Sequence, residues 1–290
     1  MEMTLKMAVA IGLKITIILL MLSLGLQIKH QSLILLWRNP RLLLGSIAAA
    51  FLIVPVVTYL VFQILPLSFG TKAGLWTVSI TPGAPMIYRA VIKRGIGNAE
   101  LAASFQITVA LLVIILAPAW LAIIGAIYGK DYGIPSSVLL KQVSTIQFIP
   151  ILVGIALHRL LPDITERAVP TLVSIGSISL NVFIVILLAV LGLRIIGGIH
   201  IWTILAAALM AASAIIGGHL LAGPELSTRL TIANANAQRN PGLALAITAW
   251  KVPEHQGASA VAVVVYLIIS IALTAIYTSI YGKSANIRVT

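Results

Sequence analysis

The chain of 290 residues contains no cysteine, and its histidines and acidic residues are few. The absence of cysteine excludes disulfide bonds, cysteine nucleophiles and thiolate metal ligands. The five histidines and seven acidic residues are scattered and show no metal-ligand spacing such as His-x-x-x-His. We therefore expect no metal site, no cofactor and no enzymatic activity, because these residues do not assemble into a base, nucleophile or metal set.

Charged residues are also scarce, at 9% of the chain, whereas about 25% are charged in an average soluble domain. Hydrophobic residues make up 60%, and the mean hydropathy is +1.10. No run of like charges and no Gly/Ser-rich or Pro-rich tract separates the apolar segments, which predicts one integral membrane domain over residues 1–290. The first apolar segment lacks a small-residue cleavage site, so we expect a permanent span.

Windows of about 20 apolar residues, the length that crosses a bilayer, predict an all-α polytopic membrane protein with nine spans. An odd number of spans places the two termini on opposite sides. Eleven Lys and Arg residues fall on one side and six on the other, which predicts an outside N-terminus and a cytoplasmic C-terminus. The net charge of +12 follows from the same rule, because basic residues of a membrane protein collect in its cytoplasmic loops. We therefore expect the lipid bilayer as a partner and no nucleic acid. The predicted spans are 5–27, 41–66, 71–93, 98–127, 137–160, 168–197, 201–222, 226–250 and 257–282.

Two of these spans carry a Pro-Gly pair near their centres, at Pro82-Gly83 and Pro241-Gly242. Proline removes a backbone donor, so each pair breaks its helix at membrane depth. The pairs lie 159 residues apart and occupy the third and eighth spans, and this odd offset predicts two halves of inverted orientation. Broken helices at corresponding positions of inverted halves are typical of the substrate site of a secondary transporter. The alternative is that both pairs are simple kinks without function.

The predicted substrate-binding residues therefore lie at the two breaks, with half-helix N–H groups and unwound carbonyls near the midplane. The second break is surrounded by Asn, Gln and Arg, which are expensive to place in a membrane without a role. The candidates are Thr81, Pro82, Gly83, Pro85, Gln238, Arg239 and Asn240.

Several short motifs resemble the bile acid:sodium symporter family, which includes bacterial uptake proteins for small organic anions. In order and spacing they cover roughly residues 15–282. The resemblance implies a nine-span form of the family's ten-span fold, in a prokaryotic-type plasma membrane. The motifs are Met21-Leu22-Ser23-Leu24-Gly25-Leu26, Arg38-Asn39-Pro40, Pro82-Gly83, Gly97-Asn98 and Asn240-Pro241-Gly242-Leu243-Ala244.

The resemblance further implies a core domain, formed by residues 41–127 and 201–282, in which the two broken helices cross. A panel domain, formed by residues 5–27 and 137–197, would pack against this core with substrate in the cleft between them. Alternating access would come from movement of the core against the panel.

The chain departs from the family pattern at the positions that serve sodium. The family's first break continues with a Ser and an Asn, and here these positions are Ile87 and Tyr88. The second break has a Glu and a Gln in the family, where this chain has Ala235 and Arg239. The chain thus loses four oxygen-bearing side chains and gains a guanidinium, which would repel a nearby sodium ion. We therefore expect transport without sodium coupling at the usual sites.

Two ionisable residues inside predicted spans each have two interpretations. Arg239 either takes the place of a sodium ion and attracts an anionic substrate, or it is a fixed structural cation that binds carbonyls of the opposite broken helix. Glu100 is either a solvated residue at a helix start, where the dipole favours a carboxylate, or a proton carrier for coupled transport.

The sequence as a whole predicts a secondary transporter that moves a small organic anion by alternating access. A channel-like pathway is one alternative, because the loss of ion-coupling residues could leave a permeation route. A receptor-like membrane protein that keeps the fold without transporting is the other.

Overall fold

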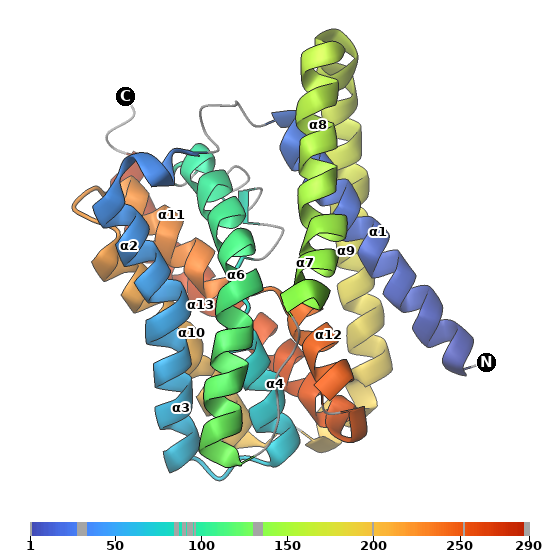
Figure 1. Ribbon diagram of the computed structural model, residues 1–290, viewed down its shortest axis with the longest axis vertical. Helices are drawn as coiled ribbons and strands as arrows, with labels where there is room; N and C mark the ends of the chain where they lie inside the picture. Colours follow the sequence, from blue (N-terminus) through green and yellow to red (C-terminus); the bar gives the residue numbers. More distant parts are fainter. Residues whose placement is uncertain are drawn as a thin grey trace. The chain divides into compact units, whose positions relative to one another are not determined.

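The computed structural model describes residues 2–27, 34–83, 87–88, 91, 95, 97–129, 136–198, 200–251 and 253–286. These residues form helices and the turns that join them (Figure 1), so the all-α prediction is confirmed. Their α-helices are α1 (Glu2–Gln27), α2 (Pro40–Ala48), α3 (Val54–Ile64), α4 (Phe69–Ser79), α6 (Ala99–Tyr128), α7 (Ser136–Val143), α8 (Ile149–Leu160), α9 (Pro162–Gly198), α10 (Ile201–Leu221), α11 (Leu226–Ala237), α12 (Pro241–Lys251) and α13 (Gln256–Asn286).

Four helix starts are capped by a side chain that accepts an otherwise unpaired backbone N–H. Asn39 Oδ1 accepts from Leu42 N at the start of α2, and Asn98 Oδ1 accepts from Leu101 N at the start of α6. Ser68 caps α4 and Asn240 caps α12 in the same way. In α2 and α12 the cap is followed by proline at the first helical position, where a missing N–H costs nothing.

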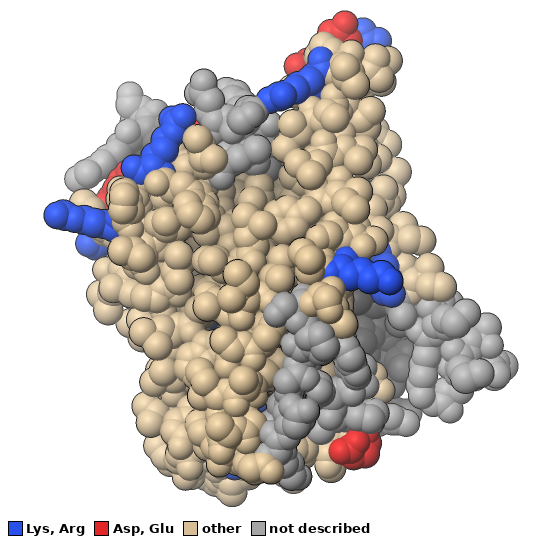
Figure 2. All heavy atoms as spheres, in the orientation of Figure 1, with Lys and Arg blue, Asp and Glu red and all other residues tan. Residues whose placement is uncertain are grey.

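The chain is an integral membrane protein with several long apolar helices. Among the described residues, five helices are long and apolar enough to cross a membrane, and α1 contributes a shorter apolar stretch, Lys14–Gln27. The five are Pro40–Ile64, Ala99–Tyr128, Ser137–Leu160, Ile201–Leu221 and Gln256–Gly282. Figure 2 shows long uncharged stretches of surface, with charged side chains in small groups. The count of nine spans stays a prediction.

The chain divides into two compact units. The first unit comprises Met1–His30 and Ser137–Gly197, and in it α1 packs against α8. Gly25 of α1 lies directly against the backbone of Ile151, and Gly154 of α8 against that of Leu22, so the two helices approach closely through small residues.

The second unit, which we call the crossover unit, comprises Gln31–Ser136 and Gly198–Thr290. Within it α10 packs against α11 and α13, and α4 packs against α12 and α13. Two helices of this unit stop within the span predicted for them, because α4 ends at Ser79 and α11 ends at Ala237. The predicted helix breaks near Pro82 and Pro241 are thus present.

The offset of 159 residues relates the helices of the crossover unit in pairs. It carries residues 40–64 of α2 and α3 onto 199–223, where α10 spans Ile201–Leu221. It carries α4 onto 228–238, close to α11, and α6 onto 258–287, close to α13. The two halves thus contain the same elements in the same order, as a repeat requires.

Candidate functional site

The first break begins where Pro82 ends the hydrogen-bond ladder of α4. Proline has no N–H to donate to the carbonyl four residues earlier, that of Val78. Thr81 replaces it, with its backbone N 3.2 Å and its hydroxyl 3.4 Å from Val78 O. Gly83 then adopts a φ of +89°, which glycine tolerates and other residues rarely do. Its carbonyl accepts a hydrogen bond of 3.0 Å from Gln106 Nε2 of α6, so the break is fixed from the neighbouring helix.

The second break follows the same logic at Pro241. The carbonyl four residues before this proline belongs to Ala237, the last residue of α11. It accepts a hydrogen bond of 2.9 Å from Tyr266 Oη, a side chain of α13. Three residues on, Asn240 Oδ1 accepts from Leu243 N at 3.0 Å and starts α12. Val78 and Ala237 are themselves 159 residues apart, so both halves free the same carbonyl.

The two breaks meet in an isolated antiparallel bridge that pairs Pro82 with Arg239. Asn240 N donates to Thr81 O at 2.8 Å, and the Thr81 hydroxyl lies 3.5 Å from Asn240 O. Thr81 and Asn240 are equivalent positions of the two halves, 159 residues apart. Contact between equivalent residues is the geometry expected where a two-fold axis relates inverted repeats.

Arg239 projects from this bridge into the interior and is only 2% exposed. One terminal nitrogen, Nη1, donates to Ala50 O at 2.8 Å and to Ser79 O at 3.2 Å. The other, Nη2, donates to Asn236 Oδ1 at 3.1 Å. Ser79 is the last residue of α4, so its carbonyl is one that the first break leaves without a helical partner. The guanidinium thus joins both broken helices.

The Ala50 carbonyl is available because of a third proline. Residues Ala49–Ile53 form a π-helical turn between α2 and α3, in which each carbonyl accepts from the residue five positions later. For Ala50 that residue is Pro55, which has no N–H. The Phe51 carbonyl, four residues before the same proline, accepts a hydrogen bond of 2.7 Å from Trp120 Nε1. Two side chains from distant parts of the sequence therefore satisfy the two carbonyls that Pro55 frees.

The charge of Arg239 has no carboxylate partner among the described residues. Its three acceptors are neutral oxygens, and its Nε has no hydrogen-bond partner within this part of the chain. The neighbouring start of α12 adds the positive end of a helix dipole. The arrangement is a buried, preorganised positive centre that is attractive to an anion and repulsive to a metal cation.

Six of the seven predicted substrate-binding residues lie together at this crossover. Thr81, Pro82, Gly83, Arg239 and Asn240 form or flank the bridge. Gln238 adjoins it, with its backbone N bonded to Asn234 O at 3.2 Å. The seventh, Pro85, lies outside the described residues.

Glu100 lies apart from the crossover. It is exposed in the first turn of α6, close to the Asn98 cap. Gln106, which reaches the first break, is six residues further along the helix, or about 9 Å. This placement is the one that the helix-start interpretation expects, and proton carriage by Glu100 stays a hypothesis.

Residues at the positions that serve sodium in the family are buried without forming an oxygen cage. Ile87 is 1% exposed and Ala235 is fully buried. Asn236, whose amide oxygen the guanidinium occupies, also donates from Nδ2 to Ala214 O at 2.7 Å. Arg239 thus engages three oxygens at the crossover, the carbonyls of Ala50 and Ser79 and the amide oxygen of Asn236.

Sequence reasoning missed some partners of the crossover residues. The sequence predicts that Arg239 could bind carbonyls of the opposite broken helix. It does not predict the contacts of Ala50, Trp120 and Tyr266. The usable signal was Pro55, because its position fixes which carbonyls lose their donor. No local pattern marks Trp120 or Tyr266 as the replacement donors.

Comparison with known proteins assigns the chain to a family. A sequence model described as the Sodium Bile acid symporter family matches residues 14–199, which is 186 of the 290 residues. The match includes the first break and ends before the second. No curated protein matches the chain.

Proposed function

The chain belongs to the sodium bile acid symporter family and is a membrane transporter, and on that premise we propose that it carries a small organic anion without coupling to sodium. The observation that carries this proposal is the buried guanidinium of Arg239 at the meeting point of the two broken helices. The resemblance of the second break to the family motif implies that Arg239 replaces a sodium-binding side chain.

Electrostatics supports the loss of sodium coupling. Two unit positive charges about 4 Å apart repel by about 4 kcal/mol at an effective dielectric constant of 20. The affinity for a sodium ion beside Arg239 would be lowered by about a thousandfold, because each 1.4 kcal/mol of binding free energy is a factor of ten in affinity. Arginine stays protonated at physiological pH, so this repulsion is permanent.

The same charge supports an anionic substrate. An unpaired cation at membrane depth is costly, and an anion that enters the crossover from a water-filled cavity offsets this cost. Both terminal nitrogens of Arg239 are already engaged by protein oxygens. We therefore assign Arg239 a long-range role in attracting the anion. We place the direct contact on the Gly242 N–H at the start of α12, because Pro241 has no N–H and those of Leu243 and Ala244 bond Asn240.

The two compact units support a core-and-panel mechanism. The crossover unit has the composition expected of the core, and the unit of α1, α8 and α9 has that of the panel. Alternating access would then move the core against the panel. Because the charge that replaces sodium is fixed, the driving force would come from substrate exchange, from the substrate gradient, or from protons through a group such as Glu100.

The substrate can be found with a thermal-shift screen of small organic acids on the purified protein, and the best acid can then be followed into proteoliposomes. Saturable uptake with counterflow would support a carrier over a channel. Arg239→Gln should lower the affinity for the acid by about tenfold or more, because it removes at least about 1.4 kcal/mol of long-range charge attraction.

The matched control is Arg159→Gln, because Arg159 is exposed in the last turn of α8. We expect its affinity to equal that of the native protein. Equal affinities of the Arg239 and Arg159 variants would refute a role of the buried charge in anion recognition.

A further inference from the structure

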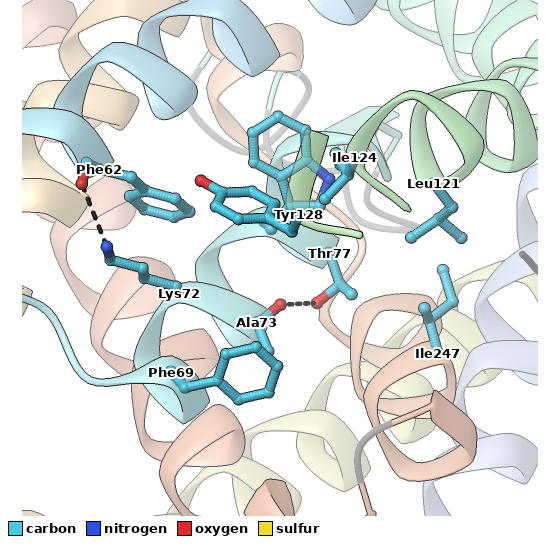
Figure 3. Close-up of a pocket in the computed structure, with 10 residues that line it drawn as sticks. Phe62, Phe69, Lys72, Ala73, Thr77, Leu121, Ile124, Tyr128 and Ile247 are labelled. Atoms are coloured by element: carbon cyan, nitrogen blue, oxygen red, sulfur yellow. Dashed lines mark hydrogen bonds between the residues drawn. The ribbon is translucent and has the colours of Figure 1, made fainter. Parts of the chain in front are cut away.

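A small apolar pocket lies within the crossover unit, among the ends of three helices. Its walls come from the C-terminal ends of α3 and α6, from most of the length of α4, and from Ile247 of α12. Figure 3 shows the rings of Phe62, Phe69 and Tyr128 on one side and Leu121, Ile124 and Ile247 on the other. On the predicted topology these helix ends face the outer surface of the membrane.

Lys72 is the one charged residue among the ten that line this pocket, all of which are described. Its ammonium donates to Phe62 O at 3.2 Å and lies 5.9 Å from the centre of the Phe62 ring. These contacts hold the charge beside the pocket and leave two of its three donors available. The lysine thus places a positive charge next to an apolar cavity.

Trp76, one helical turn after Lys72, adds a second polar group to the wall. It is 6% exposed, and its indole N–H has no hydrogen-bond partner within the described part of the chain. Tyr128 contributes a hydroxyl at the rim, where it is 44% exposed. The polar groups at the edge of the pocket are the ammonium of Lys72 and the phenol of Tyr128, and none of its ten lining residues is an acid. This combination suits a ligand that carries negative charge and has an apolar part.

The size of the pocket decides what kind of apolar group it admits. Its volume is about 90 Å³. A cavity of about 150 Å³ is needed to hold benzene, and sites for drug-sized molecules measure about 300–1,000 Å³. A ring system is therefore too large, whereas the end of a linear hydrocarbon chain fits.

We propose that this pocket is a binding site for an anionic phospholipid, with one acyl chain among the aromatic side chains and the headgroup phosphate on Lys72. The position of Lys72 in the first turn of α4 suits this ligand, because a lysine near a helix end reaches the headgroup layer while its stem covers apolar surface. Aromatic residues are enriched at the same level of a membrane. The site is separate from the crossover and does not depend on the proposed transport activity.

Native mass spectrometry of the full chain in detergent tests the site, with phosphatidylglycerol and phosphatidylcholine of identical acyl chains as probes. The native protein should bind phosphatidylglycerol more tightly. Lys72→Gln should weaken phosphatidylglycerol binding by about fivefold, the effect of one basic residue near a charged membrane surface. It should weaken phosphatidylcholine binding less, because the choline cation offsets the charge of the phosphate. Ala73→Phe, which fills the pocket without changing charge, should weaken binding of both lipids.

Lys141→Gln is the matched control, because Lys141 is an exposed lysine of the other unit on the same predicted side of the membrane. It should bind both lipids as the native protein does. Unchanged phosphatidylglycerol binding in Lys72→Gln, or unchanged binding of both lipids in Ala73→Phe, would overturn the proposal. Glycerol phosphate that binds as tightly as the lipid would also overturn it, since the headgroup anion alone would then be the ligand. If Lys72→Gln does not fold, Ala73→Phe decides.

Discussion

At the scale of single residues, prolines in this membrane protein free carbonyls that side chains from distant parts of the sequence then satisfy. Tyr266 serves the Ala237 carbonyl, Trp120 serves that of Phe51, and Arg239 serves that of Ala50. Tyr266 and Arg239 are buried and Trp120 is partly buried, at membrane depth where no water is available to bond a freed carbonyl. These contacts therefore set the local shape of the breaks as well as their stability.

Removing one such donor should destabilise the protein measurably. Tyr266→Phe deletes the hydroxyl and leaves the Ala237 carbonyl without its partner, at a cost of about 1–3 kcal/mol. We expect a lower melting temperature in detergent than for the native protein. Tyr281→Phe, at a residue that is 41% exposed, is the control and should melt like the native protein. Equal melting of the two variants would argue against the bond.

The sequence predicts which carbonyls are freed but not which side chains bond them. The positions of Pro55, Pro82 and Pro241 determine which carbonyls lose their donors, because the relation is local and follows from helix geometry. The identity of the new donor is a matter of tertiary packing. Trp120 and Tyr266 lie 69 and 29 residues from the carbonyls to which they donate, and no sequence motif around either residue predicts this hydrogen bond.

At the scale of helices, close packing of α10 on α11 holds the second broken helix in place. Gly218 of α10 faces the backbone of Ala233 in α11, and a Cβ on Gly218 would lie 2.7 Å from Ala233 Cα. Such a contact is too short to exist without moving a backbone. The adjacent Gly217 faces the flexible end of the Ile53 side chain instead.

These two neighbouring glycines make a matched pair of variants. Gly218→Ala should push α10 from α11, lower the melting temperature, and reduce substrate uptake because the second break shifts. Gly217→Ala should have a smaller effect on both, since the Ile53 side chain can rotate away. An equal or larger effect of Gly217→Ala would contradict the assigned packing.

Helix positions were more predictable than helix limits. The predicted span 201–222 agrees with α10, at Ile201–Leu221. The span predicted at 168–197 belongs to α9, which begins six residues earlier at Pro162. An apolar window misses this start because the first turns of α9 are polar, with Asp163 and Glu166 among them. Hydropathy thus finds where a helix is apolar, and proline and acidic residues indicate where it begins.

At the scale of the whole molecule, the repeat and the charge distribution make a prediction about orientation. The chain has no native cysteine, so single introduced cysteines can be labelled selectively. Cysteines at Ser32 and Ser284 should react with a membrane-impermeant reagent only from the cytoplasmic side. A cysteine at Ser136, between the fourth and fifth predicted spans, should react only from outside. Reversal of this pattern would overturn the predicted topology.

The central claim is that Arg239 stands in place of a sodium ion and makes anion transport independent of sodium. The most direct measurement is uptake of the identified organic acid into proteoliposomes with sodium chloride or with choline chloride at the same ionic strength. We predict equal initial rates in the two salts, because the fixed charge of the guanidinium repels a sodium ion at the crossover. A steep dependence of the rate on sodium would contradict the account and would show that other oxygens at the two breaks build a sodium site beside this charge.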